Sequence, residues 1–320
     1  MFRRFFPDPF IFWLLGAVVA ASLLPVRGSL AAGVDALTLA AIFSLFFLHG
    51  VRLPREALMS GITDWRLHAA ILCATFLIFP AAGLALQALF PGLLQPELWA
   101  GMLFLCALPS TVQSSIAFTS MARGNVAGAV AAAAFSNLAG VFLTPLLVGL
   151  LLQTQGAEIS LSGIGKIVAL LFLPFLLGHA VRPLLFPLVR NRPRLTTIVD
   201  KGTILLAVYS AFSAAMVEGI WSRVPPLSVA ILTALCLVLL ALVLLATWAI
   251  GRFGGFSRES RAAILFCGSV KSLASGAPMA RILFPGAAAG MVILPIMLFH
   301  SFQLIACAWI AARMGARQEP

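Results

Sequence analysis

Ten apolar runs, each long enough to cross the hydrocarbon core of a bilayer, constrain this chain more than any other feature. A membrane-spanning helix needs about 17 to 25 mainly apolar residues. With 62% apolar and 10% charged residues, the 320-residue chain has too few polar side chains to cover a soluble globule of its size. The sequence therefore predicts an all-α polytopic membrane protein with ten transmembrane helices. The runs cover approximately residues 9–25, 34–51, 67–90, 98–121, 126–151, 164–187, 202–221, 227–250, 261–284 and 287–312.

The basic residues lie mostly in the short connections between these runs. With ten spans, sixteen of the 21 Lys and Arg residues fall on the side that holds both termini, four fall on the other side, and Lys271 lies within a span. This asymmetry predicts an inner-membrane protein with cytoplasmic N- and C-termini. Although the net charge is +11, its placement argues against nucleic-acid binding. The five cysteines show no paired spacing, so neither a metal site nor a disulfide framework is indicated.

Two of the apolar runs are interrupted at corresponding places. Residues 108–120 read L-P-S-T-V-Q-S-S-I-A-F-T-S, and residues 265–276 read L-F-C-G-S-V-K-S-L-A-S-G. Each is followed by Met-Ala-Arg, and the two sequences superpose at an offset of 158 residues. Five spans per half is an odd number, which predicts two inverted repeats, residues 1–160 and 161–320, within a single transmembrane domain. Broken helices four and nine in corresponding positions predict a secondary transporter with its substrate site near the midplane.

Lys271 lies at the middle of the ninth run, between Arg261 and Arg281. It is about 15 Å from either membrane surface, beyond the reach of a snorkelling side chain. Its amine must face a wet cavity, find a polar partner or give up its proton. The alternative to a role in substrate or ion handling is a structural lysine that donates to orphan carbonyls at a helix break. All ten acidic residues fall in connections or at span ends, so the site favours an anion, or alternates between charged and neutral Lys271.

The polar residues of the interrupted runs and their neighbours are the candidate substrate or ion ligands. Any single Ser or Thr can instead bond to its own helix. For Asn137, a hydrogen bond between helices is as good an explanation as contact with a ligand. His300 is either a proton carrier or a structural histidine. The candidates are Lys271, Gln113, Ser114, Ser115, Thr111, Ser269, Ser272, Ser275, Asn137 and His300.

Several motifs resemble the bile acid:sodium symporter superfamily, solute carrier family ten, and within it the divergent member-seven-like branch with bacterial relatives. They are the stretch 109–125, Phe135-Ser136-Asn137, Thr144-Pro145-Leu146-Leu147 and Phe266-Cys267-x-x-x-Lys271-Ser272-Leu273. The resemblance implies ten helices in two inverted repeats. It also implies a core domain of segments three to five and eight to ten, in which the broken helices four and nine cross, and a panel domain of the remainder.

The chain differs from the sodium-coupled members of that superfamily at the positions that correspond to their sodium-site motifs. Their Ser-Asn pair corresponds to Ser114-Ser115, and their Glu-x-Gly-x-Gln-Asn aligns with residues 266–271, so that only Ser114 and Gly268 match. A lysine thus lies in the neighbourhood of the sodium sites. The hypothesis that follows is a permanently attached cation in place of sodium, with sodium coupling doubtful and proton coupling open.

The sequence as a whole predicts a carrier rather than an enzyme, with no cofactor. The expected function is secondary active transport of a small organic anion or amphipathic solute by alternating access. The partners are a small-molecule substrate and the lipid bilayer. Two alternatives stay open: a non-transporting regulatory membrane protein on a carrier fold, and an intramembrane hydrolase with a Ser-Lys pair, for which no further motif is present.

Overall fold

The computed structural model describes residues 10–52, 64–153, 161–219, 224–284 and 286–316. Within these ranges all regular structure is helical, which confirms the predicted fold class at the level of an all-α membrane protein. The elements are α1 (Phe10–Leu23), α2 (Gly28–Arg52), α4 (Trp65–Cys73), the π-helical η2 (Ala74–Ile78), α5 (Phe79–Leu89), α6 (Pro96–Ala107), α7 (Gln113–Met121), α8 (Val126–Gln153), α9 (Leu161–Ala180), α10 (Arg182–Arg190), α11 (Pro193–Val217), α12 (Pro226–Phe253), α13 (Arg258–Gly268), α14 (Leu273–Leu283) and α15 (Ala288–Ala316).

Seven helices in the described ranges are long and apolar enough to cross a membrane, and an eighth is added if the bent pair α9–α10 forms one span. Helices α1 and α6 are apolar but shorter. The chain is therefore a multi-pass membrane protein. The predicted boundary between the two halves falls at residue 160, which lies outside the described residues.

The sixth predicted segment is not one straight helix. The predicted run over 164–187 is divided between two helices, since α9 ends at Ala180 and α10 leaves it at an angle of 88°. Pro183 lies in the first turn of α10, where its missing N–H is tolerated. Arg182 and Arg190 at the two ends of α10 carry charges that do not belong in hydrocarbon. No residue of α10 is buried, which suits a helix that lies along a surface rather than within a bundle.

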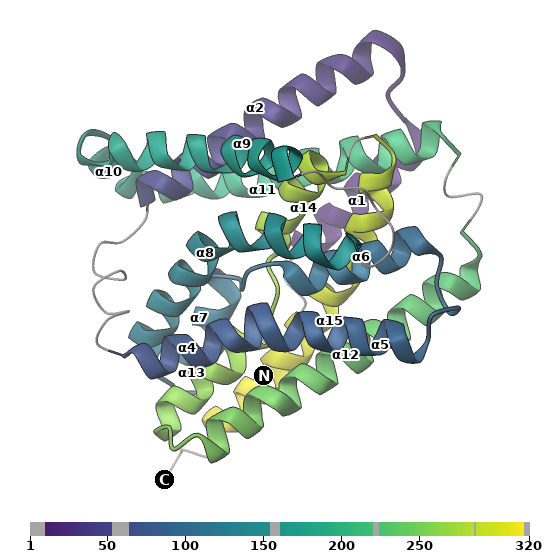
Figure 1. Ribbon diagram of the computed structural model, residues 1–320. Coiled ribbons are helices and arrows are strands. Elements are labelled where there is room, and N and C mark those ends of the chain that lie inside the picture. Colours follow the sequence, from purple (N-terminus) through teal and green to yellow (C-terminus); the bar gives the residue numbers. More distant parts are fainter. Residues whose placement is uncertain (1–9, 53–63, 154–160, 220–223, 285, 317–320) are drawn as a thin grey trace.

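The helices form two layers, which Figure 1 shows in the upper and lower parts of the view. The first layer contains α1, α2, α9, α10 and α11, with α2 packed on α9 and α11, and α1 on α11. The second layer contains the remaining helices, of which α14 reaches the first layer and packs on α11 as well as on α15. Its apolar core is centred on the packing of α6 against α15, where Trp99, Phe104 and Phe299 are fully buried.

Both interrupted runs are broken in the structure. The fourth run leaves the helical conformation after α6 and resumes at α7, because Pro109 has no N–H to donate and restricts the residue before it to an extended conformation. The ninth run is broken between α13 and α14. There Ser272 is extended and caps α14, its Oγ accepting a hydrogen bond from the N–H of Ser275 at 3.1 Å.

Candidate functional site

The two breaks touch each other in the middle of the second layer. The backbone N–H of Ser272 donates to the carbonyl of Pro109 at 2.9 Å. The hydroxyl of Ser110 donates to the carbonyl of Cys267, near the end of α13, at 2.6 Å. One backbone and one side-chain hydrogen bond thereby join residues about 160 positions apart in the chain, and the breaks in segments four and nine lie against each other.

Side chains from α8 satisfy the backbone of the first break. Ser136 accepts from the N–H of Ser110 at 3.0 Å, and Asn137 donates to the carbonyl of Ser110 at 2.8 Å. Thr144 donates to the carbonyl of Ala107 at 2.8 Å. A membrane interior offers no water to such groups, so a non-helical segment at this depth requires partners of this kind.

Gln303 of α15 satisfies the backbone of the second break. Oε1 of Gln303 accepts from the N–H of Lys271 at 2.7 Å, and Nε2 donates to the carbonyl of the same residue at 2.9 Å. The amide orientation is fixed, because the backbone N–H can only face an oxygen. Nε2 also lies 2.8 Å from Nδ1 of His300, so in this arrangement Nδ1 is an acceptor and the neutral ring carries its proton on Nε2.

Lys271 is fully buried, and its side chain turns toward the backbone. Nζ donates to the carbonyls of Thr75, Cys106 and Leu108 at 2.7, 2.8 and 2.6 Å. The residue does not line the cavity described below. The geometry thus favours the alternative given above, a lysine that satisfies carbonyls at helix irregularities, over direct contact with a substrate in this conformation.

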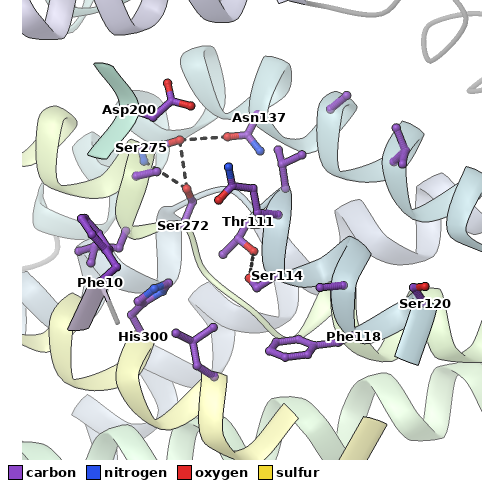
Figure 2. A pocket seen from close by; sticks show the side chains of 18 of the residues that line it. Phe10, Thr111, Ser114, Phe118, Ser120, Asn137, Asp200, Ser272, Ser275 and His300 are labelled. Carbon is purple, nitrogen blue, oxygen red and sulfur yellow. Dashed lines mark hydrogen bonds between the residues drawn. The ribbon is translucent and has the colours of Figure 1, made fainter. Parts of the chain in front are cut away.

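A cavity of about 1190 Å³ opens beside the two breaks, between the two layers. Figure 2 shows Thr111 and Ser114 from the first break facing it, with Ser272, Ser275 and Asn137 above them and His300 of α15 on the opposite wall. Of the ten predicted site residues, seven line the cavity: Thr111, Gln113, Ser114, Asn137, Ser272, Ser275 and His300.

Three predicted residues lie behind the cavity wall. Ser115 donates to the carbonyl of Thr111, and Ser269 donates to the carbonyl of Leu265, so each bonds within its own segment. Lys271 is the third. These contacts are the structural alternatives that the sequence left open for each residue.

The polar residues of the cavity wall form two hydrogen-bonded groups, one at each break. The hydroxyl of Ser275 donates to Oδ1 of Asn137 at 3.0 Å and accepts from the hydroxyl of Ser272 at 3.2 Å. Thr111 and Ser114 share a hydrogen bond between their hydroxyls (Figure 2). The N-terminal ends of α7 and α14 also meet this wall, and both present the positive end of a helix dipole to it.

The cavity wall carries an excess of positive charge. Its basic residues are Arg52, Arg123, Lys201 and Arg313, and its one acidic residue in the described ranges is Asp200. Asp200 is already paired with Arg52 at 3.0 Å. Aromatic and aliphatic side chains cover the rest of the wall, among them Phe10, Phe46, Phe118, Phe175, Leu304 and Trp309. Such a cavity suits a solute with an anionic group and an apolar body.

Ser110 and Gln303 hydrogen-bond to backbone groups at the breaks but are not among the ten predicted site residues. Ser110 directly follows Pro109 and precedes the denser polar run, so its own position carries no separate signal. Gln303 lies three positions after His300 on the same helix, where i, i+3 side chains meet, and a glutamine within an apolar run was a usable signal.

Comparison with known proteins identifies the family. The sequence pattern of the SBF-like CPA transporter family matches residues 8–316. The chain belongs to this family. Among its relatives are an uncharacterized protein of Pseudomonas aeruginosa, 50% identical over 99% of this chain and 95% of that protein, and "Putative symporter YfeH" of Escherichia coli, 46% identical over 98% and 94%. Sodium/bile acid cotransporter 7-B of Xenopus laevis is 25% identical over 95% and 91%.

Membership in the SBF-like CPA transporter family confirms the resemblance to the bile acid:sodium symporter superfamily and its member-seven-like branch. It places the chain among symporter-like membrane transporters and not among enzymes. The cavity at the two breaks is then the candidate substrate site of a transporter.

Proposed function

We propose that this chain is a secondary active transporter that moves a small organic anion or amphipathic solute by alternating access, with the cavity beside the two breaks as its substrate site. The observation that carries the proposal is the meeting of two broken helices, through their backbones, at a polar wall inside a multi-pass membrane protein.

The charge of the cavity supports an anionic substrate. Four basic residues and one paired acid give the wall a net positive formal charge, and two helix N-termini add to it. The names of the vertebrate relatives supply a first substrate class, bile acids, which combine an anionic group with an apolar body. The apolar part of the wall accommodates such a body.

The cavity is proposed to open to the cytoplasm. Arg52, Lys201 and Arg313 at its wall belong to the side that carries sixteen of the basic residues, and an excess of Lys and Arg marks the cytoplasmic side of an inner-membrane protein. Both termini then lie in the cytoplasm.

Contacts between the layers close the opposite end. Asp35 of α2 pairs with Arg281 of α14 and accepts a hydrogen bond from Ser210 of α11 at 2.6 Å. Asp35 is about 25 Å from Arg52 along the axis of α2. The structure therefore fits the inward-open state of a carrier whose outer gate contains the pair Asp35–Arg281.

The ten-helix arrangement completes the proposal. Residues 1–160 and 161–320 form two inverted five-helix repeats, in which the pair α6–α7 corresponds to the pair α13–α14. The second layer is the core domain and the first layer is the panel, and transport is a movement of one against the other.

Binding of anions to the detergent-solubilised chain tests this function. Bile acids and smaller organic anions are screened for an increase in Tm at low salt, because a ligand that binds the folded state raises its stability. In the double variant Lys201→Gln/Arg313→Gln, the concentration of anion that gives half the shift is expected to rise roughly 5- to 30-fold, from the loss of about 1 to 2 kcal/mol of attraction.

The matched control is Arg66→Gln/Arg252→Gln, which removes the same charge at residues outside the cavity and leaves anion binding unchanged. Stabilisation by organic cations instead of anions, or equal anion binding in both double variants, contradicts the proposed substrate class.

A further inference from the structure

The side chain of Lys271 occupies a position built from backbone oxygens. Its Nζ lies 2.6 to 2.8 Å from three carbonyls, which come from η2, from the end of α6 and from the first break. None of these oxygens belongs to an acidic side chain. Without the lysine side chain, the same three carbonyls would be hard oxygen ligands for a cation at the position of Nζ.

The three contacts favour the protonated form of the amine. An ammonium has three N–H donors, whereas a neutral amine has two and a lone pair that faces the third oxygen. Three short contacts with acceptor-only carbonyls are therefore the contacts of a cation. The carbonyls of Cys106 and Leu108 also end α6, where the helix dipole favours positive charge.

The positive charge is compensated without a carboxylate. Among the described residues no ion pair includes Lys271. The ring of Phe79 lies with its centroid 4.1 Å from Nζ, and that of Phe76 lies 5.8 Å away, so cation–π attraction adds to the carbonyl dipoles. Carbonyl oxygens with aromatic faces form a site that accepts monovalent cations in general.

The position is connected to the substrate cavity through the backbone. Lys271 lies in the second break, one residue before Ser272, which lines the cavity. Gln303 holds both backbone groups of Lys271 and contacts His300, another residue of the cavity wall. A cation at this position therefore fixes the conformation of the break that presents Ser272 and Ser275.

We infer that the ammonium of Lys271 is a tethered cation, permanently filling a carbonyl-lined monovalent-cation position at the crossing of the two breaks, so that this chain needs no dissociable cation there. The inference rests on the proposed transport function. It states that, at this position, the covalently attached charge of Lys271 replaces a sodium ion that would otherwise be coupled to transport. It concerns cation binding, which is measured without any transported solute.

The test is to remove the tether and supply the cation from solution. Lys271→Ala removes all but the Cβ of the side chain, and the missing piece has the size of propylammonium. The full-length variant is unfolded thermally in choline, sodium, potassium or propylammonium chloride at constant ionic strength. We expect its Tm in choline to be about 3 to 10 °C below that of the wild type, because three carbonyls lose their donor. At least half of the loss returns in propylammonium or in one of the metal cations.

Two variants serve as controls. Lys271→Met fills the same space with an apolar chain, so its Tm is lowered and does not respond to the cation. Lys201→Ala removes a lysine that contacts the ring of Phe10 at the cavity wall, and its Tm does not respond either. A response of Lys271→Ala that is shared by Lys271→Met overturns the inference, as does a Tm of Lys271→Ala that is the same in every salt.

The wild type provides a second readout if Lys271→Ala does not fold. Its Tm, and the half-saturating concentration of a stabilising bile acid, are expected to be the same in sodium and in choline. Sodium dependence of either quantity contradicts the tethered cation. Absence of any stabilising anion, with the cation results as expected, contradicts the proposed transport function alone.

Discussion

Replacing Gly178 with alanine is expected to lower the Tm of the chain by roughly 6 to 12 °C, corresponding to about 3 kcal/mol of overpacking. Helices α2 and α9 touch through their backbones. A Cβ at Gly178 meets the carbonyl oxygen of Phe47, and a Cβ at Gly50 meets that of Phe175, both far inside van der Waals contact. Because the opposing atoms are backbone, no side chain can rotate away, and the two helices have to separate along their contact.

The control for this prediction lies on α2, the helix that packs against α9 in this contact. A Cβ at Gly33 has nothing within 4 Å, so Gly33→Ala removes a helix-destabilising glycine without a clash. It is expected to leave the Tm unchanged or raise it slightly, by the equivalent of about 0.5 to 1 kcal/mol. The two variants are compared by thermal unfolding in the same detergent. Equal Tm values for Gly178→Ala and Gly33→Ala are incompatible with the backbone contact between α2 and α9.

Replacing Asn137 with aspartate is expected to weaken anion binding roughly 5- to 150-fold, a loss of about 1 to 3 kcal/mol. Asn137 joins the breaks: Nδ2 donates to the carbonyl of Ser110, and Oδ1 accepts from Ser275. Aspartate keeps the acceptor for Ser275, loses the donor to Ser110 and places a negative charge at the cavity wall. The half-saturating anion concentration is measured by thermal shift and by uptake into proteoliposomes.

Asn125→Asp is the matched control, since it makes the same chemical change outside the cavity. Oδ1 of Asn125 accepts from the N–H of Gly128 at the start of α8, and an aspartate fulfils that capping role equally well. Anion binding and Tm are expected to be those of the wild type. If Asn137→Asp binds organic anions as tightly as Asn125→Asp does, the anionic group is not bound beside Asn137.

The position of the breaks was predictable because a proline and a dense polar run are both rare inside apolar segments. Pro109 with the residues after it marked the first break, and Lys271 marked the second. Their contact was not predictable from local pattern, since it is made by backbone groups such as the carbonyl of Pro109 and the N–H of Ser272. Every residue carries such groups, so the sequence does not show which of them meet.

The same reason explains why the sequence left the direction of the Lys271 side chain open between two alternatives. Its acceptors are carbonyls at positions 75, 106 and 108, where the side chains carry no signal for a cation. Ser115 and Ser269 illustrate a second limit. A serine within a helix can face a cavity or bond to its own preceding turn, and only the rotation of the helix decides between these.

Hydrophobic length alone did not show the bend in the sixth segment. The run 164–187 is apolar throughout most of its length, but the chain turns between Ala180 and Arg182, just before Pro183. The two glycines of the α2–α9 contact were equally hidden, because the chain has 26 glycines and close backbone approach leaves no local pattern.

Access to Ala274 from the two sides of the membrane tests the alternating-access account most directly. Ala274 lines the cavity at the start of α14. In a Cys73→Ser background, which removes the one exposed cysteine of the described residues, Ala274→Cys is treated with a membrane-impermeant thiol reagent in inside-out and in right-side-out vesicles. Ala263→Cys, on α13 and fully buried, is the control and reacts in neither.

The account predicts rapid labelling of Ala274→Cys in inside-out vesicles and slower but complete labelling in right-side-out vesicles, because each molecule passes through both states. Labelling from the cytoplasmic side alone, however long the reaction, would show a static vestibule and contradict a carrier.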